Sequence, residues 1–383
     1  MSVTAAQGFR AAGVAAGIKS SGAPDVALVV NDGPADAAAA VFTRNRVKAA
    51  PVLWSEQVIK DGRLRAVVLN SGGANACTGP DGFADTHRTA EQVAAALDLG
   101  AGDVAVCSTG LIGERLPMPK LLAGVDAAVA VLAADGGTQA AEAIRTTDTK
   151  AKQATVTQSG WTVGGMAKGA GMLAPGLATM LCVITTDAMA DSATLDEAMR
   201  IATRTTFDRV DSDGCMSTND TVLVLASGAS GVQPPAAELA QALTAVCADL
   251  ARQLVADAEG STKEIAIEVT GAASEDDAVE VGRSIARNNL LKCALFGNDP
   301  NWGRVLAEIG TTSATFDPDE LDVAMNGVQI CRGGAAGERR ELVDLTGRQV
   351  TITVNLNAGD DAVTIWTNDL SHAYVEENSA YST

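Results

Sequence analysis

Short apolar runs alternate with helical patterns along the chain, and this alternation limits the possible folds more than any other feature. Runs rich in Val, Ile and Leu predict strands, most of them buried on both faces, at residues 26–30, 66–69, 104–107, 180–185, 221–226 and 264–270. Apolar residues at helical spacing predict helices at 90–97, 120–134, 195–205 and 236–258. The alternation predicts an α/β fold.

Two local patterns add detail to this prediction. Thr194 and Glu197 have the spacing of a capping box, so we expect them to cap the helix that begins at Leu195. Near the end of the chain, apolar runs at 350–356 and 362–367 flank five turn-forming residues. This second pattern predicts a β-hairpin.

Composition and charge exclude several classes of protein. A chain of 383 residues with 47% apolar composition can bury a large core. The net charge is -19 and Lys and Arg form no block, which argues against nucleic acid as a partner.

The first residues do not have the pattern of a signal peptide, and no run reaches the roughly 18 apolar residues of a membrane span. We therefore expect a cytoplasmic protein with no membrane partner, in which the seven scattered Cys are reduced and mostly buried.

The chain has few residues suited to acid–base or metal chemistry. Its two histidines, His87 and His372, have no recognisable partner in the sequence, whereas a side-chain triad normally needs a His base. Two isolated His and no paired Cys do not make a zinc site, and the phosphate-binding pattern GxxxxGK[ST] is absent. We expect neither a metal nor a cofactor.

The segment from Trp161 to Thr186 contains a Gly-rich, Pro-containing loop that runs into an apolar strand, with Thr179 at the junction. A Thr hydroxyl needs a base, and the α-amine of an N-terminal Thr, with a pKa of about 8, can serve as one. Attack of the Thr179 hydroxyl on the Ala178 carbonyl would expose that amine in mid-chain. The residues alone leave an ordinary loop entering a buried strand as the alternative.

The stretch KGAGMLAPGLATML, Lys168 to Leu181, resembles the self-cleavage site of the ornithine acetyltransferases, the glutamate N-acetyltransferases of arginine biosynthesis. The resemblance covers nearly the whole chain and includes AVFTRNRVKAAPV at 40–52, NSGGANACTG at 70–79, STGLIGERLP at 108–117, TTDTKAK at 146–152, STNDTV at 217–222, DAEGSTK at 257–263, DPNWGR at 299–304 and NSAYST at 378–383. The chain departs from the common pattern at Gly73, Cys215 and Met216. None of these three is an expected catalytic residue.

The resemblance implies a self-cleaving acetyltransferase. The chain would be cut before Thr179 into fragments 1–178 and 179–383, which share one core of layered mixed β-sheets sandwiched between helices. Thr179 would take the acetyl group of N2-acetylornithine as an ester and pass it to glutamate in a ping-pong reaction. Some family members also use acetyl-CoA as the donor, and the sequence leaves that activity open. Two copies of each fragment would form a heterotetramer.

The resemblance also assigns the site residues. Thr109 and Gly110 would stabilise the oxyanion, and Lys168 would bind a substrate carboxylate. The other substrate-binding positions are Thr146, Glu259, Asn378 and Thr383, with Thr147 and Thr149 as neighbouring alternatives to Thr146. For the DPNWGR segment we expect packing or subunit contact.

Two other functions remain as alternatives. One is a self-cleaving amidohydrolase or aminopeptidase with the same N-terminal Thr, in which water accepts the acyl group. The other is an uncleaved binding protein, which would run as one full-length band on a denaturing gel.

Overall fold

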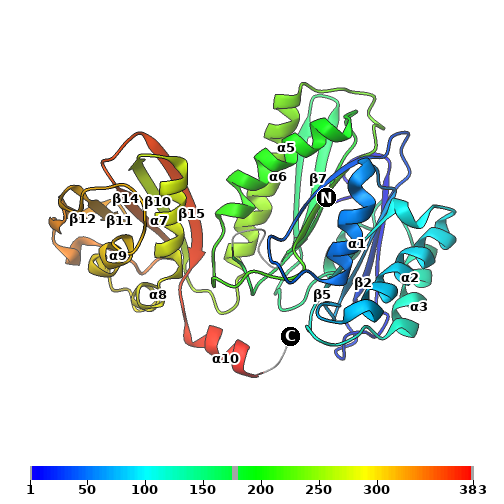
Figure 1. The fold of residues 1–383 in the computed structure, drawn as a ribbon, viewed down its shortest axis with the longest axis horizontal. Helices are drawn as coiled ribbons and strands as arrows, with labels where there is room; N and C mark the ends of the chain where they lie inside the picture. Colours follow the sequence, from blue (N-terminus) through cyan, green and yellow to red (C-terminus); the bar gives the residue numbers. More distant parts are fainter. Residues whose placement is uncertain (1, 175–179, 381–383) are drawn as a thin grey trace. The chain divides into compact units, whose positions relative to one another are not determined.

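The computed structural model describes residues 2–174 and 180–380, so Ala178, Thr179 and Thr383 lie outside the described residues. These residues divide into two compact units, each with its own core (Figure 1). The first unit contains residues up to 208 together with 215–254. The second contains 209–214 and the residues from 255 to 380.

The first unit is built on two mixed β-sheets. One sheet has the order β1-β2-β4-β5, with β1 at Phe9–Val14, β2 at Val26–Asn31, β4 at Ala66–Ser71 and β5 at Val104–Thr109. The other has the order β3-β9-β8-β7-β6, with β3 at Ala37–Phe42, β6 at Lys152–Gln158, β7 at Trp161–Lys168, β8 at Leu181–Thr186 and β9 at Thr221–Ala226. In each sheet one strand pair is parallel and the others are antiparallel. A single apolar cluster with side chains from both sheets, such as Leu69 and Val183, lies between them.

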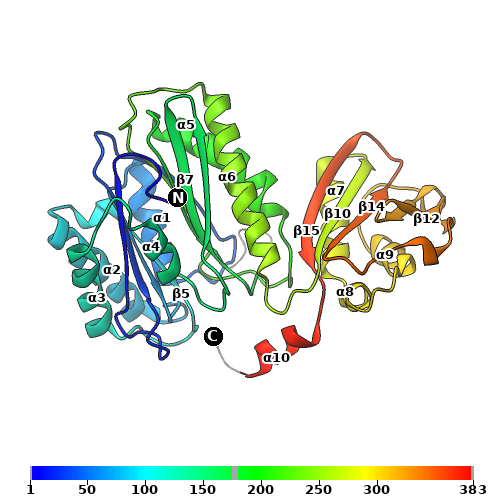
Figure 2. The ribbon, with the colours of Figure 1, turned by 180° about the vertical axis from the view of Figure 1, so that it is seen from behind.

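Helices cover the outer faces of these two sheets (Figures 1 and 2). These outer helices are α2 at Gly79–Leu97, α3 at Met118–Ala130, α5 at Ser192–Thr205 and α6 at Ala236–Ala256. Two other helices lie elsewhere: α1 at Ala50–Val58 binds the edge strand β5, and α4 at Gly137–Ala143 contributes alanines to the cluster between the sheets. Val93 of α2 and Val125 of α3 pack on the first sheet. On the second sheet, a Cβ atom at Gly165 would lie 3.0 Å from Val246 of α6, so the missing side chain lets α6 approach β7. The predicted α/β fold, with mixed sheets layered between helices, is confirmed.

The second unit has one six-stranded sheet of order β13-β12-β11-β14-β10-β15. Its strands are β10 at Glu264–Ala272, β11 at Asp322–Met325, β12 at Val328–Arg332, β13 at Ala335–Ala336, β14 at Gln349–Asn355 and β15 at Asp361–Asn368. Its helices are α7 at Glu275–Arg287, α8 at Asn289–Phe296, α9 at Trp302–Ile309 and α10 at His372–Ala380. Residues of α7, α8 and α9 pack with the sheet in one apolar cluster, and the half-buried Trp302 of the DPNWGR segment packs against it.

Two local predictions were wrong. The strands β14 and β15 do not form a hairpin, because β10 lies between them, parallel to β14 and antiparallel to β15. The connection after β14 crosses the end of β10, where Leu356 and Ala358 donate to the carbonyls of Thr270 and Gly271. The capping box is also absent, since the carboxylate of Asp191 accepts the Thr194 N–H at 2.7 Å. A charged oxygen in front of a helix N-terminus is a stronger cap than the hydroxyl we expected.

In the sequence, the predicted cleavage point falls between β7 and β8, which are neighbouring strands of the second sheet. β7 pairs antiparallel with β8, so that Lys168 is opposite Leu181. β3, β6 and β7 come from residues 1–178, and β8 and β9 come from residues 179–383. A cut before Thr179 would therefore leave two fragments joined by strand pairing, and the division at 178/179 itself stays a prediction. Within the described part of the chain, no helix is long and apolar enough to span a membrane.

Candidate functional site

Thr109 and Gly110 lie where β5 ends and its loop begins. Thr109 is 3% exposed, and its carbonyl accepts the N–H of Gly73 at 3.0 Å. Gly110 has a φ of 127°, and a Cβ atom there would lie 2.5 Å from the Gly73 nitrogen. Both the dihedral angle and the close approach of the two loops require glycine. Gly73, noted above as a departure from the common pattern, thus contacts this site through its backbone.

Lys168 is the last residue of β7 and is 2% exposed. Its Nζ donates to the Thr109 Oγ1 at 3.2 Å. The structure therefore brings together three predicted site residues, Thr109, Gly110 and Lys168, although Lys168 is 59 residues away from Thr109 in the sequence. The Thr109 hydroxyl accepts from Lys168, so its own proton is directed elsewhere and can be donated to another group.

A buried carboxylate, Asp148, organises the surroundings of Lys168. Its Oδ1 accepts from the Nζ of Lys152 and from the N–H of Gly169, both at 2.6 Å. Burial alone would raise the pKa of Asp148, but the charges of Lys168 and Lys152 outweigh it and hold the pKa well below its usual range. The sequence analysis gave Asp148 no role. The signal available in the sequence was an acidic residue within TTDTKAK, close to Lys150 and Lys152.

Thr146 is linked to the same carboxylate. Its N–H donates to the Asp148 Oδ2 at 3.0 Å, and the residue is half-buried. Thr149, one of its alternatives, is exposed. Thr146 therefore contacts the carboxylate that also binds Lys152, and its role as a substrate-binding residue stays a prediction.

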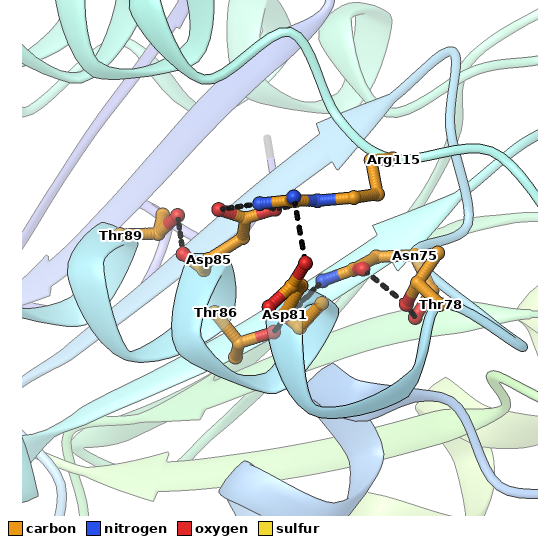
Figure 3. Close-up of polar contacts among 8 residues, drawn as sticks. Asn75, Thr78, Asp81, Asp85, Thr86, Thr89 and Arg115 are labelled. Atoms are coloured by element: carbon orange, nitrogen blue, oxygen red, sulfur yellow. Dashed lines mark hydrogen bonds and ion pairs between the residues drawn. The ribbon is translucent and has the colours of Figure 1, made fainter.

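The loops around Thr109 are fastened to the start of α2 (Figure 3). The guanidinium of Arg115 makes a two-point contact with Asp85, at 2.9 and 3.0 Å, and also reaches Asp81. In the neighbouring loop, the Asn75 Nδ2 donates to the Gly82 carbonyl and to the Thr86 hydroxyl. These bonds tie both glycine-containing loops to one helix.

Asn219 is a further residue that the sequence analysis left without a role. It is buried, and its Nδ2 donates to the carbonyls of Ser108 and Ala74 at 2.8 and 2.7 Å. Ser108 directly precedes Thr109, and Ala74 follows Gly73. The side chain thus holds the two loops together from the side of the second sheet. The motif STNDTV was recognisable in the sequence, but the sequence did not indicate which backbone carbonyls Asn219 binds.

Glu259 and Asn378 belong to the second unit and contact each other there. The Asn378 Nδ2 donates to the Glu259 Oε2 at 2.9 Å. Beside them, the Ser371 hydroxyl donates to the Gly260 carbonyl at 2.6 Å, and a Cβ atom at Gly260 would lie 2.2 Å from the Tyr374 nitrogen. The DAEGSTK loop and α10 are therefore packed closely enough to require glycine.

The histidines and cysteines, which could also take part in catalysis or metal binding, lie outside this network. His87 packs against Trp54, and the rings of His372 and Phe296 meet edge to face. Across residues 2–174 and 180–380, no three His, Cys, Asp or Glu side chains are grouped so as to hold a metal ion. Four of the seven cysteines are buried.

A model of the ArgJ family matches residues 10–383 of the chain. The chain belongs to the ArgJ family. It is 70% identical to the arginine biosynthesis bifunctional protein ArgJ of Streptomyces avermitilis over 382 residues, which is 100% of both chains. It is 62% identical to the protein of the same name from Mycobacterium tuberculosis H37Rv, over 99% of this chain and 96% of the other.

Two solved structures are also similar. Ornithine acetyltransferase of Mycobacterium tuberculosis, in complex with ornithine, is 66% identical over 47% of this chain and 96% of that chain, with a TM-score of 0.45. The ArgJ protein of Bacillus halodurans is 36% identical over 51% of this chain and 97% of that chain, with a TM-score of 0.49. The family model and the relatives that match the full length confirm the family that the motifs indicated.

Proposed function

We propose that this member of the ArgJ family is a self-cleaving acetyltransferase that moves the acetyl group of N2-acetylornithine to glutamate in arginine biosynthesis. The observation that carries the proposal is the buried contact of Lys168 with Thr109 beside Gly110, in a chain that is 70% identical to an arginine biosynthesis protein over its full length. This contact provides hydrogen-bond donors and positive charge in a water-poor site next to β8, the strand that follows Thr179.

Self-cleavage would begin when the Thr179 Oγ attacks the Ala178 carbonyl carbon. The bond from that carbon to the Thr179 nitrogen breaks, an ester to Oγ forms, and the hydroxyl proton goes to the departing nitrogen. Water then hydrolyses the ester, which leaves a carboxylate on Ala178 and a free amine and hydroxyl on Thr179. The new α-amine is the base that the chain otherwise lacks.

Acetyl transfer would use the same hydroxyl twice. The amine accepts the hydroxyl proton while Oγ attacks the acetyl carbon of acetylornithine. It then passes that proton to the departing nitrogen, so that ornithine leaves as the amine and the acetyl group remains as an ester on Thr179. The α-amine of glutamate then attacks the ester and Oγ recovers its proton. Both tetrahedral intermediates carry an oxyanion, for which the Thr109 hydroxyl and the Gly110 N–H are the donors.

The substrates share an α-carboxylate, and Lys168 is the cation that we assign to it. Following the family resemblance, we also assign substrate contacts to Thr146, Glu259, Asn378 and Thr383. The rival amidohydrolase function would need water as the acceptor, and the match to the ArgJ family along almost the whole chain favours transfer. We further propose a cytoplasmic heterotetramer with two copies of each fragment.

The decisive test of self-cleavage is the intact mass of the purified protein, together with N-terminal sequencing. We expect two fragments, one of which begins Thr179, Met180, Leu181. A Thr179→Ala chain should stay whole, and Thr179→Ser should still cleave because it keeps a hydroxyl. Cleavage at the same bond in Thr179→Ala would refute the mechanism.

The acceptor is tested by measuring ornithine release from acetylornithine with and without glutamate. Transfer predicts that release depends on glutamate, whereas equal rates would favour hydrolysis. A second assay with acetyl-CoA and glutamate determines whether this chain also makes N-acetylglutamate from that donor. Product formation there would establish the additional activity.

A further inference from the structure

Asp220 lies next to the residue that follows the proposed nucleophile. It directly precedes β9, which runs parallel to β8 with Thr221 opposite Leu181. Its Oδ1 accepts the N–H of Met180 at 3.0 Å, and the Met180 carbonyl accepts the Thr221 N–H at 3.1 Å. Met180 is therefore held at both its N–H and its C=O. Its nitrogen is covalently bonded to the carbonyl carbon of Thr179.

The Asp220 carboxyl is unusual for a group that only anchors a strand. It is fully buried, and its second oxygen has no hydrogen-bond partner among the described residues. The nearby Thr43 hydroxyl donates instead to the Ser217 carbonyl, at 2.7 Å. Burial raises the pKa of Asp220 well above its usual value, and the Met180 N–H, the Lys168 charge and the nearby hydroxyls of Ser217 and Thr43 offset this only in part. In either protonation state, the carboxyl keeps one oxygen as an acceptor for the Met180 N–H.

Asp220 is also joined to the oxyanion loop through its neighbour. Asn219 binds the carbonyls of Ser108 and Ala74, as described above. Two adjacent side chains therefore face two parts of the proposed machinery: Asn219 holds the loop with Thr109, and Asp220 holds the amide next to Thr179. Both side chains project from one short buried segment. This segment therefore sets the distance between the loop that contains Thr109 and the Met180 amide.

We propose that Asp220 is a positioning residue that fixes the Met180 amide, the peptide group next to the proposed nucleophile, and that the Asn219–Asp220 pair sets this amide in register with the oxyanion donors. This inference rests on the proposed function of Thr179. In this role, Asp220 accepts the Met180 N–H and transfers no proton.

The test compares two substitutions with a matched control at the other end of β8. Asp220→Asn keeps a neutral acceptor oxygen, so cleavage and turnover should stay within about threefold of the unaltered chain. Asp220→Ala removes the acceptor, and a displaced nucleophile should slow cleavage and lower kcat by roughly 10- to 100-fold with little change in KM. Asp187→Ala removes a buried carboxylate that accepts the N–H groups of Gln7 and Thr162, at 2.9 and 2.7 Å, so it should lower Tm but not cleavage or kcat.

Each result bears on the inference separately. Normal cleavage and kcat in Asp220→Ala would overturn it, and so would an equal loss in Asp187→Ala at an equal loss of Tm. A defect in Asp220→Asn as large as that in Asp220→Ala would replace positioning with proton transfer, and Asp220→Asn still decides this point if the Ala variant does not fold. The unaltered chain, measured alongside, reports on the proposed function by itself: a chain that is never cut before Thr179 refutes self-cleavage and this inference with it.

Discussion

The two groups of predicted site residues are held in very different ways. In the first unit, Thr109 and Lys168 are 3% and 2% exposed and are fixed by backbone bonds and a buried ion network. In the second unit, Asn378 is exposed on the final helix and binds Glu259 through one side-chain hydrogen bond. Oxyanion stabilisation requires donors that are fixed before the reaction, whereas a substrate contact can form on binding. We therefore expect Thr109 and Gly110 to control kcat, and Glu259 and Asn378 to control substrate binding.

The largest effect should come from deleting residues 378–383. The deletion removes Asn378 and Thr383 but leaves the contacts of Gly260 with Ser371 and Tyr374 that hold α10. We expect a folded chain, cleaved as usual, with no measurable transfer from acetylornithine to glutamate. A denaturing gel and a transfer assay measure the two properties. Full activity would remove both residues from the site and leave Glu259 as the residue of the second unit still assigned to it.

Gly110→Ala should cause the next largest loss. The added Cβ would lie 2.5 Å from the Gly73 nitrogen and would push apart the loops that align the oxyanion donors. We expect kcat to fall roughly 100- to 1000-fold, with a much smaller change in KM. Gly113→Ala is the matched control, because Gly113 has a φ of 92° in the same loop but no atom within 4 Å of the new Cβ. Equal losses would show that backbone strain, not loop separation, is responsible.

Lys168→Met should lower kcat/KM by roughly 10- to 100-fold, because it removes a charge and the hydrogen bond to Thr109. Lys152→Met is its control, since it also takes a buried cation away from Asp148. The control should lower Tm at least as much but reduce kcat/KM less. If both substitutions reduce activity equally, the role of Lys168 is to neutralise Asp148 and not to act on Thr109 or substrate.

Arg115→Ala should have the smallest effect on activity. It leaves the carboxylate of Asp85, whose side chain is 3% exposed, without its two-point partner (Figure 3). An uncompensated buried charge destabilises the fold, so Tm should fall by a few degrees while kcat stays within about threefold. Arg10→Ala breaks an exposed pair with Asp32 and should leave Tm nearly unchanged in a thermal melt. A kcat loss as large as that of Gly110→Ala would show that loop anchoring is part of the chemistry.

Most strands were predictable because they are buried on both faces and therefore appear as continuous apolar runs, as in β4, β5 and β9. The order of the strands in each sheet was harder to predict from the sequence. The hairpin prediction for β14 and β15 used local turn residues, but β10, more than 75 residues earlier, pairs with both strands. Closeness in the sequence is a weak guide to strand pairing, because a distant strand can pair with both of two strands that follow each other in the chain.

The site divides in the same way. Thr109, Gly110 and Lys168 were assigned from motifs, and the structure brings them together. The roles of Asn219 and Asp220 were not visible, although the letters of STNDTV were, because their partners are the backbone groups of Ser108, Ala74 and Met180. Every residue carries such groups, so the sequence does not mark the ones that a side chain will bind.

By itself, then, the sequence determined the alternation of strands and helices, the segment in which the proposed nucleophile lies, and the family. These properties depend on residue types at short spacing, which the chain displays directly. Only the tertiary structure decided that Lys168 meets the Thr109 hydroxyl, that Asp148 links it to Lys152, and that Asp220 holds the Met180 amide. The physical reason is that buried polar groups must find partners, and which partners are within reach depends on how distant strands are ordered in the sheets.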